Sequence, residues 1–202
     1  QTIELERHIG VHTERERALP AAAAAEAVTA SAAAGWDALL ADHHAAWAAA
    51  WARCDVEIEG DPESQIGVRF AIAQMIAVAP TADSGASIAA KGLTGEGYKG
   101  HVFWDTDIFL LPFYAYTLPE VARRLLTYRV DTLPAALRHA QDAGLRGAWF
   151  AWESAATGED VTPEFVVGPG GRRLQVLTGK QERDNATDLV KLAKASPGKI
   201  NY

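Results

Sequence analysis

The sequence has a single cysteine, no excess of positive charge and no long apolar run. Because Cys54 has no second cysteine to pair with, an internal disulfide framework and a cysteine-cluster zinc site are excluded, and this fits a reducing cytoplasm. The 19 Lys and Arg residues are outnumbered by 26 Asp and Glu, and a net charge of −7 would repel a nucleic acid backbone. No apolar run reaches the roughly 18 residues of a membrane span. We therefore expect a cytoplasmic protein with neither nucleic acid nor membrane as a partner.

The rest of the composition is that of a globular protein with a packed core, with 49% hydrophobic and 22% charged residues. Apolar residues alternate with polar or small ones over residues 3–11, which indicates a strand. From Ala18 to Ala50 the chain is dominated by alanine, which has the highest helix propensity, so this stretch is expected to be helical. Five residues recur every three or four positions and form one helical stripe: Trp36, Leu40, His43, Trp47 and Trp51.

Prolines and glycines predict where the later elements begin and end. Asp61 followed by Pro62 supplies a helix N-cap and a favoured first helical position. Residues 79–100 contain five glycines and no apolar period, so we expect a long, functional loop. The elements expected after it are a helix over Val102–Tyr116 kinked at Pro112, helices beginning at Pro119 and Pro134, and a small β-hairpin pairing Phe165–Val167 with Leu174–Leu177.

Chemistry-bearing residues gather between Gly92 and Asp107, where the sequence reads GLTGEGYKGHVFWDTD. Its glycines let backbone approach a ligand, and its aromatic rings and carboxylates suit a sugar, because carboxylates bond pairs of hydroxyl groups while an aromatic face covers the C–H side of the ring. The alternative is a structural loop, with core aromatic residues and Asp105 capping the next helix. For His101 the alternatives are a ligand contact and a histidine satisfied within the loop.

A second cluster again places aromatic residues beside a carboxylate, at Trp149, Phe150, Trp152, Glu153 and Ser154. It is interpreted either as part of a binding site or as a core aromatic pair with Glu153 on a cap. Residues 178–182 do not form a phosphate-binding P-loop, because Gln181 stands where a Ser or Thr must bind magnesium.

Other polar residues are given structural roles. Arg123, Arg124 and Arg129 are assigned to the solvated face of a helix. His43 and His44 adjoin each other and point to different helix faces, so they cannot jointly hold one metal. We expect neither a metal nor an organic cofactor.

Several long runs of the sequence match one known family. They are GLTGEGYKGHVFWDTD with the following LPFYAY, LTYRVDTLPAALRHAQDAGLRGAWFAWES, and LTGKQE, with VEIEGDPESQIGVRFAI and IELERHIGVHTERE upstream. These runs resemble glycoside hydrolase family 65, which contains maltose, trehalose and kojibiose phosphorylases and related hydrolases. The resemblance implies a mainly α fold: a partial (α/α)6 barrel of helical hairpins, preceded by the end of a β-sandwich domain and carrying a small β-hairpin. The expected boundaries are 1–18 for the sandwich end, 19–53 for a helical linker, 54–182 for the partial barrel and 183–202 for a tail that does not match the family.

The resemblance also implies an activity and a site. The family's usual reaction is inverting phosphorolysis of an α-linked glucose disaccharide to β-glucose 1-phosphate, with inorganic phosphate as co-substrate. Trp104 and Asp105 match residues that hold the nonreducing glucose, and Trp152 and Glu153 match a second wall of the sugar site. Three further residues fall in matching motifs and are taken as substrate-binding: Lys99, His101 and Glu182. The family is often dimeric, so a complete protein is a candidate homodimer.

One part of the family pattern is missing. The family's general acid is a glutamate in a motif rich in Tyr, His and Asn, which this sequence does not contain. Glycosidic cleavage needs a proton donor for the leaving oxygen. We therefore nominate no catalytic residue and expect an inactive fragment of a disaccharide phosphorylase. The alternatives are an inverting, acid trehalase-like hydrolase of the same family and a non-catalytic sugar-binding or helical scaffold protein.

Overall fold

The computed structural model describes residues 3, 5–12, 20–80, 85–93 and 95–181. The chain divides into two compact units, Gln1–Asp55 and Val56–Tyr202. Glu182 and the tail expected over 183–202 lie outside the described residues. Within the described ranges, no helix has both the length and the apolar character needed to cross a membrane.

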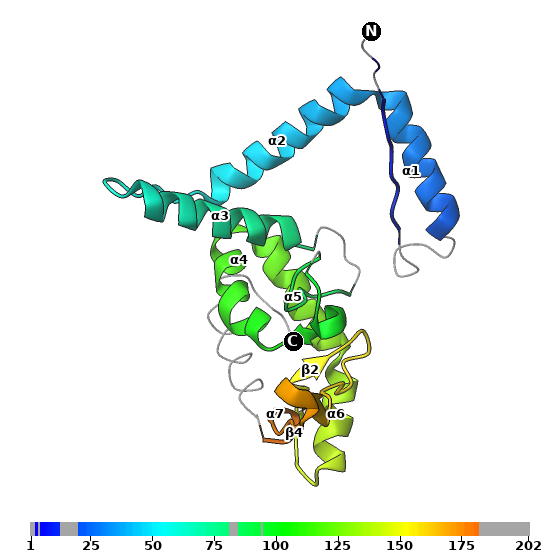
Figure 1. Ribbon diagram of the computed structural model, residues 1–202, viewed down its shortest axis with the longest axis vertical. Helices are drawn as coiled ribbons and strands as arrows, with labels where there is room; N and C mark the ends of the chain where they lie inside the picture. The colour runs from blue at the N-terminus through cyan, green and yellow to red at the C-terminus, as the bar shows by residue number, and fades with distance from the viewer. Residues whose placement is uncertain (1–2, 4, 13–19, 81–84, 94, 182–202) are drawn as a thin grey trace. The chain divides into compact units, whose positions relative to one another are not determined.

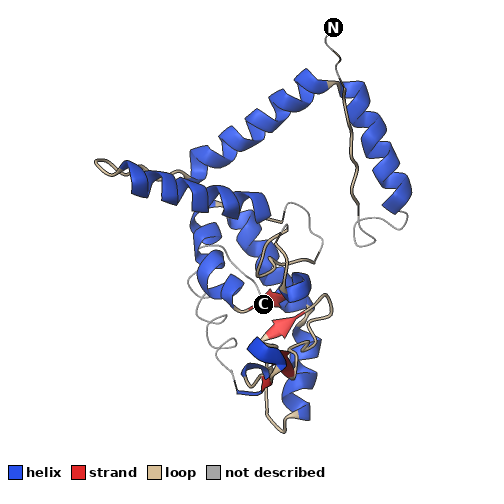
Figure 2. Ribbon diagram, in the orientation of Figure 1, coloured by secondary structure: helices blue, strands red, loops and turns tan. Residues whose placement is uncertain are grey.

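Two helices make up most of the first unit, α1 (Pro20–Ala34) and α2 (Trp36–Cys54). They are separated at Gly35, whose φ of +78° lies outside the helical region and favours glycine. The predicted alanine-rich helical stretch is therefore two helices (Figure 2). Part of the predicted stripe is visible on α2, where the Trp47 and Trp51 rings stack with centroids 6.4 Å apart.

The segment expected to be a strand, residues 3–11, pairs with no strand in the described part of the chain, and its described residues 5–11 are extended (Figure 1). It runs beside α1 (Figure 1). Gly10 lies so close to α1 that a Cβ there would meet the backbone oxygen of Ala24 and come within 3.1 Å of Val28 Cγ2. The segment is therefore packed against a helix, and its apolar residues Ile9 and Val11 remain exposed.

Successive helices build the second unit. They are α3 (Pro62–Val78), α4 (Leu111–Thr117), α5 (Pro119–Asp131) and α6 (Leu133–Asp142), with a short α7 (Thr178–Gln181) near the end. The predicted starts are confirmed: Asp61 accepts a hydrogen bond from Ser64 N at 3.1 Å as the N-cap of α3, and prolines occupy the first turns of α5 and α6. The largest fully buried hydrophobic side chains lie on α4 and α5: Leu111, Tyr114, Leu125 and Tyr128. The fold is mainly α, as expected.

In the described part of the chain, two small antiparallel sheets accompany the helices. One pairs β1 (Val102–Phe103) with β2 (Glu153–Ser154), and the other pairs β3 (Phe165–Val167) with β4 (Arg173–Gln175). The second sheet confirms the predicted hairpin, although its second strand begins one residue earlier than expected.

The helix predicted over Val102–Tyr116 is wrong at its start. Val102 and Phe103 instead form β1. Their partners in β2 lie 50 or more positions away, so local sequence periodicity does not reveal the pairing. After β1 comes η2 (Thr106–Leu110), a π-helical turn that leads directly into α4. Pro112 lies in the first turn of α4, where its missing N–H costs little.

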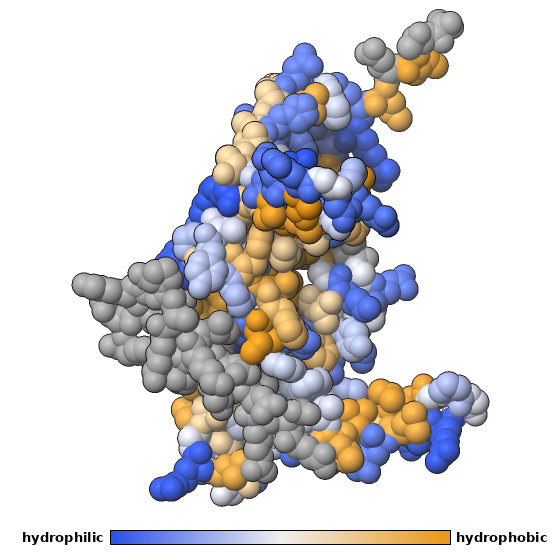
Figure 3. Space-filling view, turned by 90° about the vertical axis from the view of Figure 1, so that its left-hand side faces the viewer, coloured by the Kyte–Doolittle hydropathy of each residue, from blue (hydrophilic) through white to orange (hydrophobic). Residues whose placement is uncertain are grey.

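Apolar side chains also reach the surface of the second unit. On α3, Ile66 and Phe70 are 71% and 66% exposed. The face drawn in Figure 3 shows apolar surface (orange) between the hydrophilic patches. Exposed apolar surface of this kind contacts other protein surfaces or promotes aggregation.

The loop after β2 packs tightly on the end of α5, which gives a first prediction. Gly158 has a φ of +75°, and a Cβ there would meet the side chain of Thr132, with Cγ2 at 2.7 Å. Gly158→Ala is expected to lower the free energy of unfolding by about 2–4 kcal/mol, from left-handed backbone strain plus overpacking. Thermal unfolding followed by circular dichroism measures the loss.

Gly144→Ala is the matched control. Its φ of +70° is similar, but nothing lies within 4 Å of its Cβ position, so this variant carries the backbone strain alone. Equal losses in the two variants would contradict the proposed contact between Gly158 and Thr132.

Candidate functional site

The pairing of β1 with β2 brings the two predicted clusters together. Phe103 lies opposite Glu153, and Trp104 follows β1 just as Trp152 precedes β2. The two indole rings therefore come side by side, with centroids 6.0 Å apart and planes at 44°. Residues that are far apart in the sequence thus share one site.

Other aromatic side chains extend this pair into a cluster. The Phe103 ring meets Trp152 edge-on at 6.2 Å, and Tyr98 meets Phe103 edge-on at 5.0 Å. On the other side, Phe109 lies 6.2 Å from Trp104. The cluster offers flat apolar faces of the type that cover the C–H side of a sugar ring.

Trp104 also presents an unused hydrogen-bond donor. Its Nε1 is buried and has no hydrogen-bond partner among the residues that the structure describes. Leaving a buried N–H unpaired costs about 1–3 kcal/mol. A ligand oxygen at this position would remove that cost, so the orphaned donor favours a binding role for Trp104.

A buried carboxylate lies beside the aromatic cluster. The Glu153 side chain is 10% exposed, and its Oε1 lies 2.7 Å from Nδ1 of His101, which is 19% exposed. Because an ionised carboxylate only accepts, Nδ1 of His101 carries the proton when Glu153 is ionised. The structure thus joins His101 from the glycine-rich loop to Glu153 from the second cluster, and Glu153 is not a helix cap.

Asp105 is exposed and stands directly before η2, but its side chain makes no capping hydrogen bond there. The alternative interpretation from the sequence, in which Asp105 caps the next helix, is therefore wrong. Its carboxylate remains available to solvent or a ligand, next to Trp104.

Lys99 lies in an unusual turn. Four consecutive residues have positive φ, from +94° at Gly97 through +50° at Tyr98 and +51° at Lys99 to +75° at Gly100. Non-glycine residues rarely adopt this conformation, and such strain is concentrated at functional sites. The turn leaves Lys99 exposed at the start of the segment that leads to His101. Glu182, the remaining predicted site residue, lies outside the described residues.

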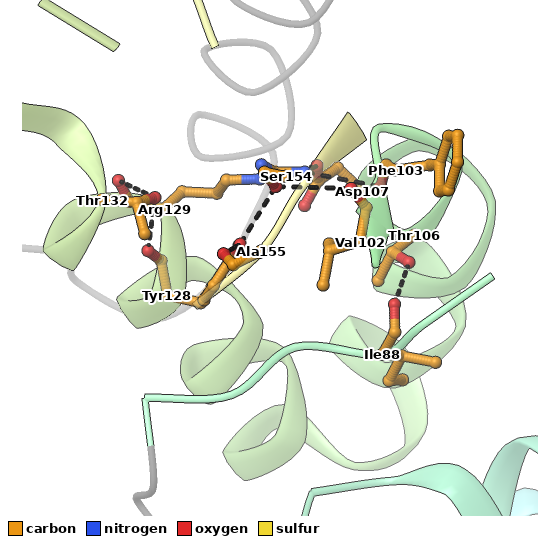
Figure 4. Close-up of polar contacts among 10 residues, drawn as sticks. All are labelled: Ile88, Val102, Phe103, Thr106, Asp107, Tyr128, Arg129, Thr132, Ser154 and Ala155. Atoms are coloured by element: carbon orange, nitrogen blue, oxygen red, sulfur yellow. Dashed lines mark hydrogen bonds and ion pairs between the residues drawn. The ribbon is translucent and has the colours of Figure 1, made fainter. Parts of the chain in front are cut away.

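Sequence reasoning missed a buried ion pair behind the site. Arg129 was assigned to a solvated helix face, which is wrong: its side chain is 4% exposed, and its Nε and Nη2 donate to Asp107 Oδ2 at 2.9 and 2.6 Å (Figure 4). Burial raises the pKa of Asp107 above its ordinary value, while the Arg129 guanidinium opposes that rise. A sequence signal did exist, because Arg129 follows the buried Leu125 by four positions and therefore shares its face of α5.

The described part of the chain holds no group of three or more His, Cys, Asp or Glu side chains that could bind a metal ion. The chemistry that its residues offer is hydrogen bonding by a carboxylate and an indole N–H beside aromatic faces. Such an arrangement suits a neutral polyhydroxylated ligand.

Comparisons with known proteins point to one family. The model of the glycosyl hydrolase family 65 central catalytic domain matches residues 69–193, and that of the family's N-terminal domain matches residues 1–50. A kojibiose phosphorylase from Halothermothrix orenii is 45% identical over 157 residues, which are 77% of this chain and 20% of that protein. A nigerose phosphorylase from Lachnoclostridium phytofermentans is 42% identical over 133 residues, which are 66% of this chain and 18% of that protein.

A solved structure agrees with the sequence relatives. A candidate kojibiose phosphorylase from the human microbiome superposes with a TM-score of 0.70 at 25% identity, over 91% of this chain and 22% of the other. The chain thus spans about a fifth of the length of the curated relatives it matches. The central-domain match alone covers more than half of the chain and includes Trp104, Glu153 and the strands that join them, so this protein belongs to glycoside hydrolase family 65.

Proposed function

We propose that Trp104, Trp152 and Glu153 form part of the pocket for the glucosyl residue of an α-linked disaccharide. The observation that carries the proposal is the β1–β2 pairing. It sets a buried indole N–H, which has no partner among the described residues, beside a second indole and a buried carboxylate. Each of these groups has a complementary partner on a sugar: a hydroxyl oxygen, the C–H face of the ring and a hydroxyl hydrogen.

The roles of the remaining candidates follow from their positions. His101 orients the Glu153 carboxylate through the 2.7 Å contact, so that Glu153 accepts from sugar hydroxyl groups in a fixed direction. Asp105, exposed next to Trp104, supplies a second carboxylate. Lys99 and Glu182 enter the proposal through the family resemblance only.

For the complete enzyme we propose inverting phosphorolysis. Inorganic phosphate attacks the anomeric carbon as the bond from that carbon to the glycosidic oxygen breaks, and a general acid gives its proton to the leaving sugar oxygen. The products are β-glucose 1-phosphate and a free sugar, and no cofactor takes part. The phosphorylase relatives support this reaction. Glu153 is assigned to binding and not to proton donation, so the 202-residue chain is expected to bind sugar without cleaving it.

Titration calorimetry with glucose and kojibiose tests the pocket. The chain is expected to bind, and Trp104→Ala, which removes both the indole face and the orphaned N–H, is expected to weaken binding at least about tenfold, or about 1.4 kcal/mol. Trp36→Ala is the matched control, since Trp36 is a 64% exposed tryptophan of α2.

Two outcomes would count against the pocket. Undiminished affinity in Trp104→Ala would show that the sugar binds elsewhere. Absence of sugar binding to the folded chain would favour the helical scaffold alternative.

A further inference from the structure

Two adjacent residues of α5, Tyr128 and Arg129, contact the two strands that carry the candidate site: Tyr128 contacts β2 and Arg129 contacts β1 (Figure 4). The Tyr128 hydroxyl donates to the backbone oxygen of Ala155 at 2.7 Å and lies 3.0 Å from Ser154 Oγ. Ser154 Oγ in turn donates to the backbone oxygen of Val102 at 3.3 Å. Tyr128 therefore anchors β2, and through Ser154 it also reaches β1.

Arg129 holds the end of β1 and the turn that follows it, on both sides of Trp104. Its Nη2 donates to the backbone oxygen of Phe103 at 3.4 Å, which belongs to the peptide bond that joins Phe103 to Trp104. The same guanidinium binds Asp107, whose backbone N–H donates to Trp104 O at 2.9 Å. One buried cation thus fixes the chain immediately before and after Trp104 and Asp105.

The local backbone depends on such support. η2 is a π-helical turn, a rare conformation that frequently occurs at functional sites. Its first residue, Thr106, donates from Oγ1 to the backbone oxygen of Ile88 at 2.9 Å, and its second residue is Asp107. Relaxation of this turn to an ordinary α-helix would change the direction in which Trp104 and Asp105 leave β1.

We propose that the Asp107–Arg129 pair is a positioning device that sets the direction of Trp104 and Asp105. Stability alone does not explain such a pair, because well-packed apolar residues of similar volume commonly serve a core equally well or better. What apolar residues cannot supply is the pair of directed hydrogen bonds that hold Phe103 O and the turn at Asp107. The expected loss of sugar binding on removal of the pair rests on the proposed function. The expected change in the orientation of Trp104 does not.

The test uses the double variant Asp107→Leu with Arg129→Met, which removes both charges together. Its melting temperature is expected to stay within about 5 °C of the wild type, because no uncompensated charge is left buried. The readout is the ¹⁵N-labelled indole N–H resonance of Trp104, identified among six tryptophans as the signal lost in Trp104→Phe. In the double variant without ligand, we expect this resonance to move or broaden.

The control removes an exposed ion pair, in the variant Arg138→Met with Glu159→Gln, where the two side chains are 59% and 63% exposed. It is expected to leave the Trp104 resonance in place. An unmoved Trp104 resonance in the folded double variant would overturn the proposal. If the double variant fails to fold, the single variant Arg129→Lys decides: it keeps the buried charge but loses the two-nitrogen grip on Asp107, and an unmoved resonance there would likewise overturn it.

Sugar titration then separates this proposal from the proposed function. If the wild type binds glucose, the double variant is expected to bind at least about tenfold more weakly. Equal affinity would remove the positioning role while leaving the sugar site intact. If the wild type does not bind, the proposed function fails, and the ligand-free resonance still decides the positioning role.

Discussion

Replacing Arg129 alone by methionine is expected to lower the free energy of unfolding by about 3–5 kcal/mol at neutral pH, because it leaves the Asp107 carboxylate buried without its partner. Urea unfolding followed by circular dichroism measures this loss. The same substitution at Arg138, whose ion pair with Glu159 is exposed, is expected to cost far less. Similar losses at the two positions would contradict the buried pair.

This loss is expected to depend on pH in a definite direction. Burial raises the pKa of Asp107 above 3.8, and removing Arg129 removes an influence that lowers it. A carboxyl group whose pKa is higher in the folded state stabilises the fold below its unfolded pKa, and that contribution is lost as the pH rises through the folded pKa. Lowering the pH from 7 towards 4 should therefore narrow the gap between Arg129→Met and the wild type. A gap that widens would contradict this assignment.

The second large effect is expected at Glu153. Glu153→Gln keeps the size of the side chain but removes the charge that strengthens its hydrogen bonds, including the contact with His101. Sugar affinity is expected to fall about 10- to 100-fold, which corresponds to the 1.5–3 kcal/mol of a hydrogen bond to a charged group. Calorimetry with glucose and kojibiose measures the change.

Glu159→Gln is the matched control for this experiment, since Glu159 is an exposed glutamate of the same unit. It is expected to leave sugar affinity unchanged. If Glu153→Gln binds sugar as well as the control does, Glu153 is only a structural partner of His101.

Much of the helical architecture could be predicted because its signals are local. Asp61 and Pro62 mark the start of α3 through a cap and a fixed φ, and Pro119 marks the start of α5 in the same way. The break at Gly35 was missed because the surrounding alanines have a high helix propensity. The φ of +78° at this glycine, which separates α1 from α2, leaves no signal in the sequence beyond the glycine itself.

The site was predictable only in part, because its geometry comes from contacts between distant positions. Composition drew attention to Trp104 and to Glu153, and the family resemblance assigned both to one sugar site. Their convergence depends on a two-residue strand, β1, whose partner β2 lies 50 or more positions away. Such a strand is too short to leave a periodic pattern. The same distance hid the contact between His101 and Glu153.

Arg129 illustrates a different limit. A charged residue on a helix is usually solvated, and the prediction followed that tendency. The Arg129 side chain is buried because its charge is compensated by Asp107, which lies 22 positions earlier in the sequence. Helical spacing from Leu125 placed Arg129 on the buried face, but only the structure identifies the partner that makes burial tolerable.

We propose phosphorolysis as the reaction of a full-length family 65 enzyme that carries this sequence. The most direct test is ³¹P NMR of that enzyme with α-linked glucose disaccharides such as kojibiose and nigerose, with and without inorganic phosphate. If phosphorolysis is the reaction, a new phosphate ester, β-glucose 1-phosphate, and a free sugar are expected to appear only when phosphate is present. Release of glucose at the same rate without phosphate, and with no phosphate ester formed, would contradict it and identify a hydrolase.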